Sequence, residues 1–258
     1  MNIVTIINVH TDPELVQHTI GSVKKWVTDK IVVVVDQRNW DAFKNFPFQN
    51  IDLIKGAFNA PPYKNIAIGM NYAYAKYPNA DWYNYIEYDV LYLNDFFKED
   101  LIKRSNCANL GFCHCIAGCQ TDGDLPRKIL NKPELQAEYM LGAVNFYSNN
   151  CVQQLMSFDF FNEVLNQTNN GYNFPNFGHV TVEEIIYPTA AGAFGPVDNL
   201  TDYANPLKIS GYGSTCERYA VRYIPNIELD DVTPLTSIIH PSKNLNCPIR
   251  QQHIDFLC

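Results

Sequence analysis

Short apolar blocks alternate with amphipathic, helix-length stretches through the first ninety residues of the chain. Ile3–Val9 and Ile31–Val35 are apolar runs of strand length, as expected for parallel strands that are buried on both faces. Further strands are expected at 51–54 and 82–92, and helices from a cap at Thr11 and Asp12 to about Trp26, at 41–46, and between Pro62 and Pro78. This alternation predicts right-handed crossovers and a parallel sheet, which together form a Rossmann-like half.

The second half of the sequence is less regular. Its pattern predicts strands at 109–117 and 140–147, helices at 151–165 and 181–191, a loop at 169–178, extended segments at 206–212 and 222–228, and an irregular tail from Pro241. We find no internal repeat and no long linker. With 258 residues, the chain is therefore expected to form one α/β domain over residues 1–258, built on a mostly parallel mixed sheet.

Charge and hydropathy narrow the classes of partner. Lys and Arg number 19 and Asp and Glu number 27, which gives a formal net charge of −8 without any basic run. This balance argues against nucleic acid or an anionic membrane surface as a partner. The longest apolar run, Ile31–Val35, is far too short to span a bilayer, and residues 1–10 do not resemble a signal peptide. We therefore expect a cytoplasmic protein without an integral membrane segment.

Five residues that could bind a metal gather near the middle of the chain: Cys107, Cys113, His114, Cys115 and Cys119. A structural zinc site prefers ligand pairs two to four residues apart with a second pair further along. On a strand, Cys113 and Cys115 would point to one face and His114 to the other, which divides the set. Reduced, buried cysteines in a reducing compartment are therefore the expectation, and zinc is the less favoured alternative.

Two carboxylates stand late in the fourth expected strand. Glu87 and Asp89 stand two positions apart, so on a strand both would face the same way. They follow an apolar and aromatic stretch in which an unpaired charge would be costly to bury. Oxygen ligands of this kind suit Mg²⁺ or Mn²⁺, and ligands of open parallel sheets bind beyond the carboxyl ends of the strands. A surface turn with two solvated acids is the alternative.

The position of this acid-x-acid triplet, directly after a βαβαβαβ half of about ninety residues, resembles the GT-A glycosyltransferases, and most closely the large inverting bacterial family. The resemblance covers residues 1–95, with Asp36 closing the second strand and Lys64-Asn65-Ile66-Ala67 opening the helix before the triplet. It implies a nucleotide-sugar-binding half over 1–95 and an acceptor-binding and catalytic half over 96–258. It also implies donor contacts for Asp36, Lys64 and Asn65. The Gln37-Arg38-Asn39 that follows Asp36 departs from the Gly/Ser-rich turn frequent in that family.

Two later segments extend the resemblance. The Glu183-Glu184 pair at a helix start is similar to the acidic dipeptide from which the family takes its catalytic base. The alternative is a pair of acids that the helix dipole favours. The segment His240-Pro241-Ser242-Lys243 resembles an element in which the histidine completes the metal shell and the lysine contacts the diphosphate.

The resemblance implies a metal-dependent, inverting glycosyltransferase. It would take a sugar from a UDP-, GDP- or dTDP-sugar to a glycan or glycoconjugate acceptor. Asp89, Glu87 and His240 are the expected ligands of Mn²⁺ or Mg²⁺, and Glu184, with Glu183 as the alternative, is the expected base. A sugar-phosphate nucleotidyltransferase is less favoured, because residues 8–12 lack the Gly-rich basic loop that grips a triphosphate. A non-catalytic module that only binds a glycan or a partner is the other alternative.

Overall fold

A computed structural model describes residues 1–11, 13–58, 61–109, 123–140, 142–172, 182–200, 213–215, 219–222, 227, 229, 232–243 and 245–251. The expected cap residue Asp12 lies outside these ranges, as do Cys113, His114, Cys115 and Cys119. The expected strand at 109–117, the extended segments at 206–212 and 222–228, and the loop at 169–178 fall mostly outside them. Cys107, Cys151 and Cys247 are buried.

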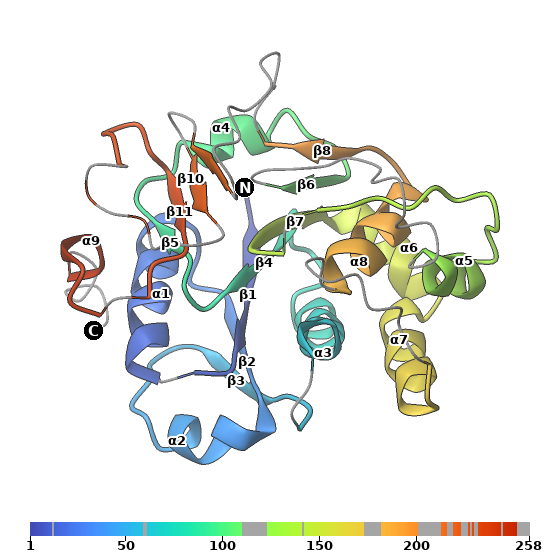
Figure 1. Cartoon of the computed structure of the whole chain (residues 1–258), viewed down its shortest axis with the longest axis horizontal. Helices are drawn as coiled ribbons and strands as arrows, with labels where there is room; N and C mark the ends of the chain where they lie inside the picture. Colours follow the sequence, from blue (N-terminus) through green and yellow to red (C-terminus); the bar gives the residue numbers. More distant parts are fainter. Residues whose placement is uncertain are drawn as a thin grey trace.

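The protein is an α/β structure around a seven-stranded mixed sheet (Figure 1). The strands lie in the order β3 (Asp52–Lys55), β2 (Ile31–Val35), β1 (Ile3–Val9), β4 (Trp82–Glu87), β7 (Val144–Ser148), β6 (Cys107–Asn109) and β8 (Val197–Asn199). β1, β2, β3 and β4 are mutually parallel, as the sequence predicts for the first half. β7 runs antiparallel to both β4 and β6, which makes the sheet mixed.

Helices cover both faces of this sheet. The bounds of the helices are Pro13–Trp26 (α1), Trp40–Lys44 (α2), Pro62–Lys76 (α3), Phe97–Leu101 (α4), Asp124–Leu130 (α5), Asn149–Ser157 (α6), Phe160–Asn169 (α7), Glu183–Gly192 (α8) and Pro248–Gln251 (α9). A short 3₁₀ turn at Gln37–Asn39 precedes α2. In Figure 1, α1 lies on one side of β1 and α3 on the other. None of the helices in the described ranges has the length and apolar character needed to cross a bilayer.

The two faces of β1 belong to two separate apolar clusters, because successive strand side chains point in opposite directions. Ile3 and Ile7 pack with α1, whereas Val4 and Ile6 pack with α3. The latter contact is close at Gly69 of α3, where an added Cβ would lie 2.6 Å from Ile6 Cγ2. Glycine therefore allows α3 to lie directly on the sheet.

A second, four-stranded sheet lies beside α1, in the order β5-β11-β10-β9. Its strands are Leu91–Tyr92 (β5), Ile238–His240 (β11), Tyr219–Arg222 (β10) and Gly213–Thr215 (β9). β11 pairs antiparallel with β5 through Ile239 opposite Leu91 and Ile238 opposite Tyr92. This pairing brings a C-terminal segment to the end of β4.

The structure corrects the fourth expected strand, which ends at Glu87 rather than at Tyr92. Tyr88 and Asp89 form a turn, and the chain then enters the second sheet. Thr19 of α1 donates its hydroxyl to the Tyr88 carbonyl, and the Ser22 hydroxyl accepts the Tyr92 N–H at 3.3 Å. These contacts with α1 redirect the backbone, so Asp89 does not share a strand face with Glu87.

The helix expected at 151–165 is also corrected, because it is two helices, α6 and α7. Asp159 between them has a φ of 52°, in the left-handed region that interrupts a helix and that aspartate tolerates better than most residues. The pattern also does not predict α4, α5, β8, β9 and β11, which the structure contains. The other predicted elements of the described ranges differ by a few residues at their ends. The tail that was expected to be irregular contains the short helix α9.

Candidate active site

The carboxyl end of β4 carries the centre of the candidate site. Glu87 is the last residue of β4 and lies opposite Asn8 near the end of β1. It is on the α3 side of the sheet, because Tyr83 and Tyr85, four and two positions earlier, belong to the cluster around α3. Asp89 follows in the turn. Both acids therefore lie at the edge where open parallel sheets bind their ligands.

Glu87, Asp89 and His240 form a cluster with metal-binding geometry. The His240 Nε2 atom lies 3.1 Å from Glu87 Oε2 and 3.3 Å from Asp89 Oδ1. One ligand atom from each residue lies within 4.8 Å of the other two. Two carboxylates and one imidazole suit Mn²⁺ or Mg²⁺, and three protein ligands leave positions of an octahedral ion for phosphate oxygens and water. The donor set therefore fits a divalent cation.

The same three side chains form a charged network in the protein without metal. Although burial alone raises the pKa of the Asp89 carboxyl, which is only 1% exposed, His240 and Lys243 lower that pKa to about 2. Burial lowers the pKa of His240, but Asp89 and Glu87 outweigh it and raise that pKa to about 10. Protonated His240 is therefore paired with both acids.

β11 places His240 by its pairing with β5. Ile238 and Ile239 are fully buried, and the strand ends at His240, directly before Pro241. After Pro241, the Ser242 N–H donates to the Asp89 carbonyl at 2.9 Å. The C-terminal segment is thus hydrogen-bonded to the turn that carries Asp89.

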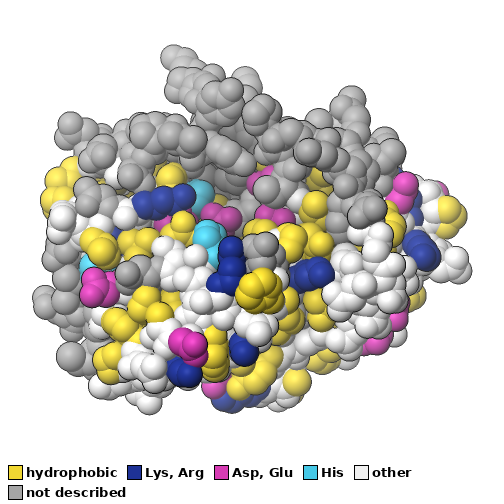
Figure 2. Space-filling model, turned by 60° about the horizontal axis from the view of Figure 1, so that its bottom comes forward, with side chains coloured by type: hydrophobic (Ala, Val, Ile, Leu, Met, Phe, Trp, Pro, Cys, Tyr) yellow, Lys and Arg dark blue, Asp and Glu magenta, His cyan; other side chains and the backbone are white. Residues whose placement is uncertain are grey.

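Lys243 adds a second cation to the Asp89 side of the cluster. Its Nζ atom lies 3.4 Å from Asp89 Oδ2 and 5.9 Å from the centre of the Tyr88 ring. The Lys243 side chain is about half exposed, so its ammonium group is accessible from solvent. Figure 2 shows histidine side chains beside Asp/Glu and Lys/Arg side chains near the middle of one face of the molecule.

Glu183 and Glu184 begin α8, and both are buried. The Glu184 Oε1 atom accepts the Gly142 N–H at 2.9 Å. The carbonyl of Ala143, the residue after Gly142, accepts the Glu87 N–H at 3.0 Å. Adjacent residues of one segment therefore join Glu184 to Glu87. Burial first, and then the charges of Glu87 and Glu183, raise the pKa of Tyr85 far above its usual value, so Tyr85 is close to both acids.

Asp36 closes β2 as expected, but its carboxylate is paired with Arg38. The Arg38 Nε and Nη2 atoms each donate to one oxygen of Asp36 at 3.0 Å, and the Arg38 N–H donates at 2.9 Å. Asp36 is 1% exposed, whereas the Arg38 side chain is 48% exposed. The accessible charge of the pair is therefore the guanidinium.

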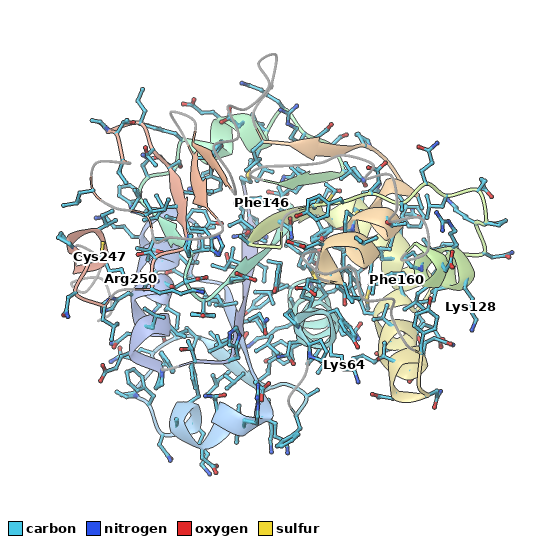
Figure 3. The ribbon with its side chains drawn as sticks, viewed as in Figure 1. Lys64, Lys128, Phe146, Phe160, Cys247 and Arg250 are labelled. Carbon is cyan, nitrogen blue, oxygen red and sulfur yellow. The ribbon has the colours of Figure 1, made fainter. Side chains whose placement is uncertain are left out.

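Asn65 and Lys64 occupy different environments at the start of α3. Asn65 is buried, donates to Asn8 Oδ1 at 3.1 Å and accepts the Ala57 N–H at 3.1 Å. The Lys64 Nζ atom donates to Asn169 Oδ1 on α7 at 3.0 Å. In Figure 3, Lys64 lies on the α3 side of the sheet, away from Arg250. Asn65 therefore supports the loop after β3 from inside, and the described contact of Lys64 is with α7.

The pattern analysis did not identify three residues beside the site: Asn8, Tyr85 and Arg250. Asn8 is a polar residue at the end of a buried strand, which is a signal that could have identified it. Tyr85 stands two positions before Glu87 and so shares its face of the sheet. The sequence around Arg250 gives no comparable signal.

Comparisons with known proteins add little to these observations. No protein-family model matches the chain, and no curated protein matches it. Among solved structures, the chain is similar to the apo structure of WbbM, described as a bifunctional glycosyltransferase, with a TM-score of 0.44 and 12% identity. The match covers 100% of this chain and 50% of that one, so the chain spans half the length of that protein. At this level of similarity, functional arguments rest on the site itself.

Proposed function

We propose that this protein is a metal-dependent glycosyltransferase that moves a sugar from a nucleotide-sugar to a hydroxyl group of a glycan or glycoconjugate. The observation that carries the proposal is the cluster of Glu87, Asp89 and His240 at the carboxyl end of β4. Its members come from the end of the nucleotide-binding half and from a segment about 150 residues further along the chain. Lys243 lies beside the same cluster.

The charges around the cluster support a diphosphate as part of the ligand. Glu87, Asp89 and His240 would hold Mn²⁺ or Mg²⁺, which when bound stabilises negative charge on a departing nucleoside diphosphate. A divalent cation offsets the two carboxylates, so the half-exposed Lys243 remains as positive charge for the phosphates. Nearby, burial lowers the pKa of the Arg250 guanidinium to about 10, and the negative charge of Asp89 opposes part of that shift.

Glu184 is the proposed general base. In an inverting transfer, the hydroxyl oxygen of the acceptor attacks the anomeric carbon while a carboxylate takes the proton of that hydroxyl. The Glu184 carboxylate lies in the first turn of α8, and the Gly142 N–H fixes its orientation. Glu183, which interacts electrostatically with Tyr63, Tyr85 and Tyr187, is the alternative base.

The nucleoside is proposed to lie over the ends of β1 and β2. Arg38, held by Asp36, offers a guanidinium to the ribose or the base, and the Asn8–Asn65 pair supports the adjoining loop. Lys64 would contact the donor only after leaving Asn169. These contacts leave the choice among UDP-, GDP- and dTDP-sugars to experiment.

The test is a titration of UDP-, GDP- and dTDP-sugars with and without Mn²⁺, followed by a transfer assay with a panel of sugar acceptors. Binding of one donor class only with metal, together with release of the nucleoside diphosphate, is the expected result. Turnover of a nucleoside triphosphate with a sugar phosphate would instead identify a nucleotidyltransferase. Metal-dependent donor binding without turnover on any acceptor would indicate a binding module.

A further inference from the structure

Arg250 is a fully buried arginine next to the candidate metal site. It lies on α9 and reaches toward α1, where Figure 3 places it. Its Nε atom donates to the Ser242 carbonyl, and its Nη1 atom donates to the Leu15 carbonyl of α1 at 3.0 Å. One guanidinium therefore joins the segment after β11 to the helix that packs against β1.

Ser242 connects this arginine to the metal cluster. Its N–H donates to the Asp89 carbonyl at 2.9 Å while its own carbonyl accepts from Arg250. Ser242 stands between His240 and Lys243, whose side chains both contact Asp89. A shift of the Ser242 peptide would therefore move both cationic side chains relative to the Asp89 carboxylate.

The energetics argue against a role in stability alone. Burying a guanidinium is costly, and a well-packed apolar side chain of similar volume commonly stabilises a core as well or better. Within the described part of the chain, the Arg250 Nη2 atom has no hydrogen-bond partner, so the charge is only partly compensated. An apolar side chain could not donate hydrogen bonds to the Ser242 and Leu15 carbonyls at the same time, as Arg250 does.

We propose that Arg250 is a positioning residue that holds the Ser242 peptide against α1 and so keeps His240 and Lys243 at the metal and diphosphate site. The inference rests on the proposed function, because it assumes that Glu87, Asp89 and His240 bind a divalent cation. Groups that orient metal ligands without touching the metal typically contribute tenfold to a hundredfold to metal affinity. Arg250 acts in this way through the backbone of Ser242.

The experiment compares Arg250→Met and Arg250→Lys with wild type and with Arg127→Met. Arg127 is a matched control, because its side chain is also largely buried and its Nε atom donates to a backbone carbonyl, that of Leu135, at 2.7 Å. For each protein, the Mn²⁺ Kd is measured by electron paramagnetic resonance. Ligation by His240 is followed as ¹⁴N coupling to the bound Mn²⁺ in electron spin-echo spectra, and folding is checked by thermal unfolding.

Arg250→Met is expected to weaken Mn²⁺ binding about tenfold or more and to reduce the ¹⁴N coupling. Arg127→Met should lose thermal stability without changing either metal readout. A folded Arg250→Met protein with wild-type Kd and coupling would overturn the inference. If Arg250→Met does not fold, Arg250→Lys is the deciding variant, because lysine keeps the charge but cannot span the Ser242 and Leu15 carbonyls. A wild-type Mn²⁺ Kd in Arg250→Lys would equally overturn the inference. Wild-type protein that shows no ¹⁴N-coupled Mn²⁺ would instead contradict the proposed metal site itself.

Discussion

His240 Nε2 lies 3.1 Å from Glu87 Oε2, although the two residues are 153 positions apart in the chain. The contact forms because β11 pairs with β5, directly after the turn that follows β4. The proposed cation site therefore depends on pairing between two short strands of the smaller sheet. The predictions below test the parts of that site one at a time.

Asp89→Asn should abolish Mn²⁺-dependent binding of the nucleotide-sugar, because it removes a buried oxygen ligand. It should also lower the free energy of unfolding without metal by about 1–3 kcal/mol, since protonated His240 and Lys243 would lose their buried partner. Calorimetric titration and urea unfolding measure the two effects. Asp95→Asn, at an exposed acid that pairs with Lys98, is the control and should change neither. Donor binding of wild-type strength in Asp89→Asn would refute the metal site.

Stability without metal should fall as the pH rises through the alkaline range. The pKa of His240 is raised to about 10 in the folded protein, above its usual value of about 6.5, because the carboxylates of Asp89 and Glu87 outweigh the effect of burial. The contribution of this residue is therefore fully present below about pH 6.5 and is lost toward pH 10. Urea unfolding at pH 6 to 10 should show the decline in wild type and a shallower one in His240→Gln. Equal slopes in the two proteins would contradict the buried ion network.

Glu184→Gln should slow sugar transfer by about 10²–10⁴-fold while donor binding stays unchanged, because a general base contributes about that much. Glutamine keeps a carbonyl oxygen for the Gly142 N–H, so the fold around α8 should be retained. Steady-state rates and donor Kd values are compared with those of Glu183→Gln. A slow Glu183→Gln beside an active Glu184→Gln would move the role to Glu183, and full activity in both would exclude the pair.

Lys243→Gln should weaken binding of the nucleotide-sugar about tenfold while binding of Mn²⁺ alone changes little. In the proposed site, the ammonium group faces the diphosphate and is not a metal ligand, and an ion pair with phosphate is sensitive to ionic strength. Donor Kd values at several salt concentrations should therefore vary less steeply in the variant. Lys98→Gln, at a surface lysine paired with Asp95, is the matched control. An unchanged donor Kd would separate Lys243 from the phosphates.

The sequence predicted the first half of the sheet well because its strands are continuous apolar runs whose burial decides their structure. Ile3–Val9 and Ile31–Val35 were placed to the residue. The end of β4 was not, because Thr19 and Ser22 of α1 set it through contacts with the backbone of residues 88 and 92. Such tertiary hydrogen bonds leave no periodic signal in the strand itself.

The candidate site was predictable to a different extent from the fold. The resemblance to GT-A enzymes pointed to Glu87, Asp89, His240 and Lys243, and the structure brings these residues together. It could not give the pairing of Asp36 with Arg38, because the arginine stands where the family pattern has a Gly/Ser-rich turn. The sequence analysis also did not identify Arg250. The proposed role of this residue follows from its complete burial, which neither its local sequence nor its charge indicates.

The backbone of Gly142 and Ala143 sets the spacing between Glu184 and Glu87. The Gly142 N–H donates to the Glu184 side chain, and the Ala143 carbonyl accepts the Glu87 N–H. The distance between the two acids is therefore fixed by main-chain geometry. Main chain between a strand and a helix has far less freedom than a pair of side-chain rotamers. Under the proposed function, a change of the surrounding surface would accommodate a different acceptor, while the spacing between the proposed metal ligand Glu87 and the proposed base Glu184 stays constant.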